Sequence, residues 1–118
     1  MRKFLLSAFV LLFTPSVFAF SGNDLLQRLK AHQQINEGRG DGSIWQTGLS
    51  QFGLGFVAGI YFTLDDIDPK VCLPNQGGNV GQYVAVTIRH LENNPNKLHR
   101  PAEALVREAA IQAFPCKR

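Results

Sequence analysis

Two cysteine landmarks, Cys72-Leu73-Pro74 and Phe114-Pro115-Cys116, constrain this chain more than any other feature. The chain has no other cysteine. Cysteines in an exported protein usually pair, because nothing outside the cytoplasm keeps them reduced. A bond between them closes a loop of 43 intervening residues, which restricts the unfolded chain by about 4 kcal/mol. The sequence therefore predicts a small domain crosslinked by one disulfide near its C-terminal end. The alternative is two unpaired buried thiols.

The first residues have the pattern of a removable export signal. Arg2 and Lys3 form a basic start, residues 4–13 are apolar, and Val17 and Ala19 place small side chains before a cut. We predict a signal peptide over residues 1–19, which is too short and too early for a convincing membrane span. Since we see no later uninterrupted apolar run of sufficient length, we expect no membrane insertion after cleavage.

Charge and length limit what the exported part can be. The whole chain has a formal charge of +3, but without Arg2 and Lys3 it holds ten basic and nine acidic residues, or +1. A nucleic-acid-binding protein needs a basic face, so we expect no nucleic-acid partner. Residues 20–118 are enough for one domain with one core and too few for two.

Hydrophobic spacing predicts four helices, and therefore an all-α fold: a compact single domain stapled by one disulfide. The expected helices cover residues 23–35, 44–64, 79–93 and 101–114. Polar residues mark their starts: Ser21 or Asn23 for the first, Ser43 for the second, and Asn79 with Gln82 as a capping box for the third. Asn94-Pro95 ends the third helix, and Pro101 suits the first turn of the fourth.

The stretch from residue 44 to 64 is the most apolar after the signal, and we predict that it is the central buried helix. A strand is the alternative, because the stretch contains four glycines and many aromatic or branched residues. Gly55 and Gly59 lie one helical turn apart, which would let another helix approach closely. The aromatic residues Phe52, Phe56 and Phe62 fit ordinary core packing; the alternative is the wall of a cavity for an apolar ligand.

Residues for catalysis or metal binding do not form a recognisable pattern. His32, His90 and His99 are scattered; we expect His90 on the solvated face of its helix and His99 as a cap at the start of the fourth helix. Neither Ser43 nor Ser50 lies in a nucleophile elbow. Asp65, Asp66 and Asp68 could hold calcium, but they lack the spacing of a calcium loop, so a solvated loop is the better interpretation. We therefore expect no enzyme activity, no metal and no cofactor.

Several motifs along the chain resemble those of a known family. They are Gly53-Leu54-Gly55-Phe56-Val57-Ala58-Gly59, Val71-Cys72-Leu73-Pro74, Gly81-Gln82-Tyr83-Val84-Ala85-Val86, His90-Leu91-Glu92-Asn93-Asn94-Pro95, His99-Arg100-Pro101-Ala102 and Ala113-Phe114-Pro115-Cys116. In this order they resemble the Rap/Tai family of periplasmic immunity proteins, which neutralise peptidoglycan amidase effectors of type VI secretion systems. The resemblance covers nearly the whole of residues 20–118.

The resemblance implies a periplasmic helical domain, often a homodimer, that blocks the catalytic cleft of a cognate amidase. Many relatives carry a second cysteine pair, and the corresponding places here are Leu29 and Gly53. Recognition commonly lies on loops of a rigid scaffold, so we expect partner contacts at the two charged segments, Glu37–Gly42 and Asp65–Asp68. The candidate side chains are Glu37, Arg39, Asp41, Asp65, Asp66 and Asp68. The alternative function is a stand-alone periplasmic chaperone or envelope-stress protein.

Overall fold

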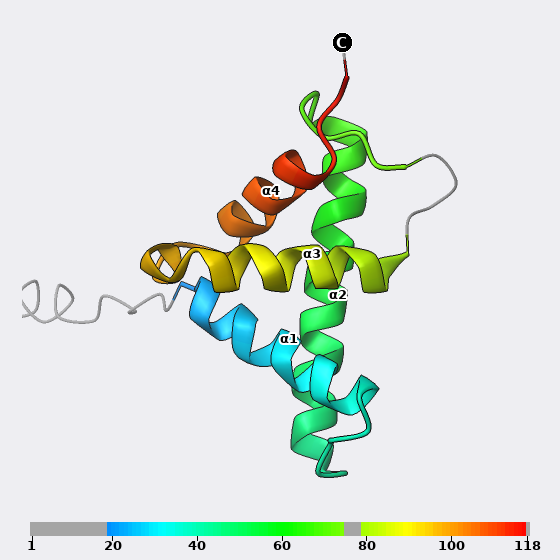
Figure 1. Ribbon diagram of the computed structural model, residues 1–118, viewed down its shortest axis with the longest axis vertical. Coiled ribbons are helices and arrows are strands. Elements are labelled where there is room, and N and C mark those ends of the chain that lie inside the picture. The colour runs from blue at the N-terminus through cyan, green and yellow to red at the C-terminus, as the bar shows by residue number, and fades with distance from the viewer. Residues whose placement is uncertain (1–18, 75–78, 118) are drawn as a thin grey trace, which may run out of the picture.

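A computed structural model describes residues 19–74 and 79–117, and it contains four α-helices (Figure 1). The predicted signal peptide falls outside the described residues except for Ala19. The elements are α1 (Gly22–Asn36), α2 (Ile44–Ile67), α3 (Val80–Asn93), the short 3₁₀ helix η2 (Pro95–Lys97) and α4 (Ala102–Ala113). The described residues form no strand, only two isolated bridges, Ser21 with Pro101 and Val71 with Pro115. The predicted all-α fold is confirmed.

The long helix α2 is the axis of the molecule (Figure 1). In this view α1 and α4 lie to one side of α2 and α3 crosses it, and each of these helices contacts α2. The core lies where they meet. It contains Tyr61, stacked on Tyr83 with 4.6 Å between ring centroids, and the Tyr61 hydroxyl lies 3.3 Å from Thr87 Oγ1. The other large buried side chains are Leu25, Leu29, Val57, Leu91, Leu105 and Val106.

Local sequence signals place the helix starts. The Ser21 side chain accepts from the Asp24 backbone N–H while Asp24 accepts from the Ser21 N–H, so α1 begins with a full capping box. Ser43 caps α2 as predicted by accepting from the Gln46 N–H. At α3 the predicted capping box is absent: the Asn79 side chain accepts from the Gly81 N–H, one residue short of Gln82. Pro101 lies just before α4, which has no side-chain cap, so the role expected of His99 is not filled.

Helix α2 buries only one of its faces, so its predicted burial is only partly correct. The buried residues Ser50, Gly53, Val57, Tyr61 and Leu64 follow helical spacing. The strand alternative is excluded, since the segment is helical from Ile44 to Ile67. By length and composition alone, α2 is apolar enough to cross a membrane. Its five buried residues instead face the other helices of this domain.

The glycines of α2 do not act as predicted. A Cβ atom at Gly55 or Gly59 would meet nothing within 4 Å, so no helix of the described residues approaches there. The close approach is at Gly53, where a Cβ atom would lie 3.0 Å from Arg28 Cβ and 3.2 Å from Leu29 Cδ2. Residues 29 and 53, where the family resemblance would place a second cysteine pair, are therefore neighbours across α1 and α2.

The predicted disulfide between Cys72 and Cys116 is confirmed, with 4.9 Å between the two Cα atoms. The adjoining backbone reinforces it, because the Cys72 N–H donates to the Phe114 carbonyl at 2.9 Å. The first described residues are also held by contacts with the rest of the domain. The Ala102 N–H donates to the Phe20 carbonyl, and the Phe20 ring packs on Phe52 and Phe56 at centroid distances of 5.4 and 5.0 Å. Residues near the C-terminus thus hold both the start of the domain, at Phe20, and the segment after α2, at Cys72.

Candidate functional site

The six predicted contact residues do not form one site. Glu37, Arg39 and Asp41 precede α2, whereas Asp65, Asp66 and Asp68 lie at its far end (Figure 1). A helix of 24 residues is about 36 Å long at 1.5 Å per residue. A single small cleft therefore cannot contact both groups, and they are two separate candidate surfaces.

The loop between α1 and α2 is exposed but well braced. All residues from Glu37 to Gly42 are exposed. The Asp41 carboxylate accepts from the Ser43 N–H at 2.8 Å, and hydrogen bonds to Ser43 lower the pKa of Asp41. The Asp41 N–H donates to Gln46 Oε1 at 2.7 Å, and Arg39 pairs with Glu37. Positive φ angles of 73° and 74° at Gly38 and Gly42 allow the two sharp bends. The loop therefore presents charged side chains from a fixed backbone.

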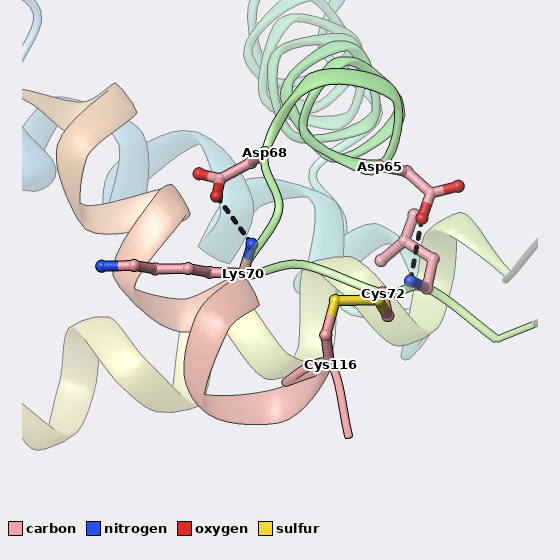
Figure 2. The surroundings of a disulfide bond; sticks show 6 residues. Asp65, Asp68, Lys70, Cys72 and Cys116 are labelled. Carbon is pink, nitrogen blue, oxygen red and sulfur yellow. Dashed lines mark hydrogen bonds between the residues drawn. A yellow bond between two sulfur atoms is a disulfide. The ribbon is translucent and has the colours of Figure 1, made fainter. Parts of the chain in front are cut away.

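The other end of α2 is a set of internal contacts, not the solvated loop that we predicted. Asp65 and Asp66 lie inside α2, and Asp68 is its C-cap. Figure 2 shows Asp65 and Asp68 on either side of the Cys72–Cys116 bond, where Asp65 accepts from the Leu73 N–H at 2.9 Å. Asp68 accepts from the Lys70 N–H at 3.0 Å and from Arg107 Nε at 2.6 Å, and these bonds lower the pKa of Asp68. Two of the three carboxylates therefore hold the chain together here.

His32 and His90 have structural partners, whereas His99 is exposed. His90 is buried, with 6% of its surface exposed, so the prediction of a solvated side chain is wrong. Its Nε2 lies 3.3 Å from Glu108 Oε2, and the same carboxylate also contacts Arg100 and Lys97. Although burial raises the pKa of Glu108, the Arg100 and His90 hydrogen bonds and the nearby cations lower it overall. This cluster joins α3, η2 and α4.

His32 lies between α1 and α2. Its Nδ1 is 3.0 Å from the hydroxyl of the buried Ser50, and its Nε2 is 2.9 Å from Asn36 Nδ2. Ser50 and Asn36 thus occupy both ring nitrogens of His32, and among the described residues no carboxylate bonds to either nitrogen to complete a triad. Within residues 19–74 and 79–117, no group of three or more His, Cys, Asp or Glu side chains could hold a metal ion.

The sequence did not predict that the outward face of α2 exposes large apolar side chains. Trp45 is 75% exposed, Phe52 52% and Phe62 46%. A groove of about 460 Å³ runs beside Gly55 and Gly59, with Phe56 and Ile60 among its lining residues. The signal that could have revealed this face is the absence of any charged residue from Ile44 to Leu64, all around the helix and not only on one side. Such a helix must cover a second apolar face or leave it exposed.

Comparison with known proteins identifies the family to which this chain belongs. A family model of the Rap1a immunity proteins matches residues 21–116, which is nearly the whole described domain. The chain belongs to the Rap1a immunity protein family. Its match spans all four helices and both disulfide cysteines, so the resemblance deduced from the sequence motifs is confirmed. Neither the curated proteins nor the solved structures contain a significant match.

For a Rap1a family member, the expected partner is an effector protein. The two candidate surfaces at the ends of α2 differ in how freely they could meet such a partner. The α1–α2 loop projects charged side chains, whereas Asp65 and Asp68 are engaged within the chain. The loop is therefore the better candidate for recognition.

Proposed function

We propose that this protein is a periplasmic immunity protein that binds and inhibits a peptidoglycan amidase effector of a type VI secretion system. The family match over residues 21–116 carries the proposal. The N-terminal signal pattern supports export to the compartment where peptidoglycan lies. The protein would act by binding alone, without enzyme activity of its own. Self-association as a homodimer is part of the same proposal.

The α1–α2 loop is the element that we assign to effector contact. An inhibitor must hold its contact residues still, because ordering a mobile loop on binding costs about 0.5–1.5 kcal/mol per side chain. Here Asp41, Ser43 and Gln46 brace the backbone, while Glu37 and Arg39 remain 45% and 63% exposed. Preformed charge on a projecting loop supports fast and selective association.

The experiment is co-expression of this protein and an amidase encoded beside it, both directed to the periplasm. We expect the protein to prevent lysis and to bind the amidase tightly in calorimetry. Reversing charge in the loop, with Glu37→Lys and Arg39→Glu together, should weaken binding at least tenfold and leave the melting temperature unchanged. The matched control is Glu103→Lys, a charge reversal at an exposed position on α4.

Two results would contradict the proposal. If no amidase from the same organism binds at micromolar concentration, the stand-alone envelope protein becomes the better explanation. If the amidase is bound but the loop variant binds as tightly as the control, the contact lies elsewhere. Asp66→Lys then tests the other end of α2, because Asp66 is exposed and none of the hydrogen bonds or ion pairs described above involves it.

A further inference from the structure

The first turn of α2 carries the two most exposed large apolar side chains of the described residues. Ile44 is 92% exposed and Trp45 is 75% exposed. Neither is a core residue, and within the part of the chain that the structure describes the Trp45 ring stacks on no other ring. The first turn of a helix favours carboxylates, yet this one has no acidic residue. Folding of the chain therefore does not account for the pair.

The pair lies at one end of the molecule. Figure 1 shows the α1–α2 loop and the start of α2 at one end of the long axis, beyond α3 and α4. We call residues 37–45 the tip. Its loop residues, Glu37 to Gly42, are all exposed. A projecting end of this kind fits a concave surface, and the binding sites of enzymes are clefts or cavities.

We propose that Ile44 and Trp45 are the apolar anchor of the tip, which enters an apolar pocket of the effector, while the charged loop side chains surround it. This inference rests on the proposed function and names the chemistry of the contact. The tip carries two carboxylates, Glu37 and Asp41, against one guanidinium, Arg39. The rim of the effector pocket should therefore be net positive.

The anchor is held in place before binding. Ser43 Oγ accepts from the Gln46 N–H at 3.0 Å, and the Ser43 carbonyl accepts from the Thr47 N–H at 3.1 Å and from Thr47 Oγ1 at 3.0 Å. Gln46 Nε2 also donates to Gln34 Oε1 on α1 at 3.0 Å. These bonds fix the turn that carries the pair. A tryptophan side chain has only two rotatable bonds, so fixing it on binding costs little conformational entropy.

Trp45 has enough exposed surface to act as an anchor. Taking about 250 Å² for the whole side chain, the 75% that is exposed amounts to about 190 Å². This is nearly a quarter of the surface of about 800 Å² that each partner buries in a standard interface. Tryptophan is enriched among the few residues that dominate binding, which lie centrally and are surrounded by contacts that exclude water. Ile44 and the charged loop provide such surroundings.

Other occupants suit the tip less well. Anionic lipid headgroups would repel Glu37 and Asp41, and the tip contains no lysine to attract them. A second copy that met this one tip to tip would bring the same two carboxylates of each copy together, and like charges facing one another are unfavourable. An effector pocket with a positive rim meets neither objection.

Calorimetry with the amidase of the co-expression experiment tests the anchor. Trp45→Ala should raise the dissociation constant by about 30-fold or more, and Ile44→Ala by about fivefold or more. The matched control is Ile67→Ala, because Ile67 is 72% exposed at the other end of the same helix. This control should bind like the wild type. All three variants should keep the wild-type melting temperature, because each shortens an exposed side chain.

Fluorine NMR tests directly whether the effector covers the anchor. The chain has one tryptophan, so incorporation of 5-fluorotryptophan gives a single resonance, from Trp45. Adding the unlabelled amidase should move this resonance and abolish its shift between H₂O and D₂O, because the ring leaves water. Without the amidase, the resonance should not change with protein concentration or on addition of phosphatidylglycerol vesicles.

Several results would overturn the proposal. If the amidase binds Trp45→Ala as tightly as Ile67→Ala, or if the Trp45 resonance keeps its solvent shift in the complex, the anchor is wrong and the immunity function still stands. If the wild type binds no amidase, the immunity function and the anchor are both wrong. A resonance that moves with protein concentration or with vesicles, and not with the amidase, would assign the tip to a second copy or to a membrane.

Discussion

Substituting Gly53 and Gly59 with alanine should have opposite effects on stability, although both are glycines in the interior of α2. At Gly53 the new methyl group would lie 3.0 Å from Arg28 Cβ, 3.2 Å from the Arg28 carbonyl carbon and 3.2 Å from Leu29 Cδ2. The Arg28 atoms belong to or adjoin the backbone of α1 and cannot swing away. The α1 and α2 helices must therefore separate slightly.

The size of the effect follows from two opposing contributions. Overpacking costs about 1–3 kcal/mol, whereas replacing glycine by alanine inside a helix gains about 1 kcal/mol. Gly53→Ala should thus lower the free energy of unfolding by about 1 kcal/mol. The methyl group added by Gly59→Ala would meet nothing within 4 Å, so this variant should raise the free energy of unfolding by about 1 kcal/mol. For a domain of about 100 residues the two melting temperatures should differ by about 8–16 °C.

The assay is thermal and urea unfolding followed by circular dichroism, at several protein concentrations so that any dimer contribution is separated. The wild type should lie between the two variants. If Gly53→Ala is as stable as Gly59→Ala, the close approach of α1 and α2 at Gly53 is wrong. Gly53→Leu should then also be tolerated, whereas the structure requires it to be the most damaging of the three.

Two further predictions concern the disulfide and the Glu108 cluster. Thiol titration of the denatured protein without reductant should find no free thiol, and Cys116→Ser should lose about 2–5 kcal/mol of stability, measured by urea unfolding; two free thiols or an unchanged midpoint would contradict this. The lowered pKa of Glu108 means that its contribution is present above its ordinary pKa of 4.5 and is lost as the pH falls through the folded value. Glu108→Gln should therefore lower the free energy of unfolding at pH 7 and make that free energy vary less with pH below about 4.5. Some variation should remain, because the pKa values of the Asp24, Asp41 and Asp68 carboxylates are also lowered.

The helix positions could be predicted because their signals are local. Ser21 and Ser43 accept hydrogen bonds from residues three positions further along, and Asn94-Pro95 ends α3 at the expected place. The buried face of α2 could not be predicted, because apolar residues surround this helix and no polar side marks the solvent. Its glycines then suggest close packing wherever they fall, and only the structure shows that Gly53 is the one in contact.

The partners of His90 and Asp68 were harder to predict, because these contacts join residues that lie far apart in the sequence. His90 lies beside Arg89 and Glu92 in the sequence and looks like a surface residue, yet its partner Glu108 comes from α4, 18 positions away. Asp68 likewise pairs with Arg107 across 39 positions. Neither pairing has a sequence signal. In contrast, the braced loop before α2 depends on neighbours within five residues, and its charged side chains were identified correctly as exposed.

The way that the first and last parts of the domain meet has a consequence for the export that we propose. A chain that crosses a membrane unfolded from its N-terminus emerges with Phe20 first, but Phe20 binds Ala102 and Gly22 binds Arg100. Cys72 likewise cannot form its disulfide until Cys116 has emerged. Neither closure can form until almost the entire chain has been translocated, so the domain should complete its fold only after it leaves the export channel. On this proposal, chaperones and thiol oxidants outside the cytoplasm would act on a long chain that has not yet completed its fold.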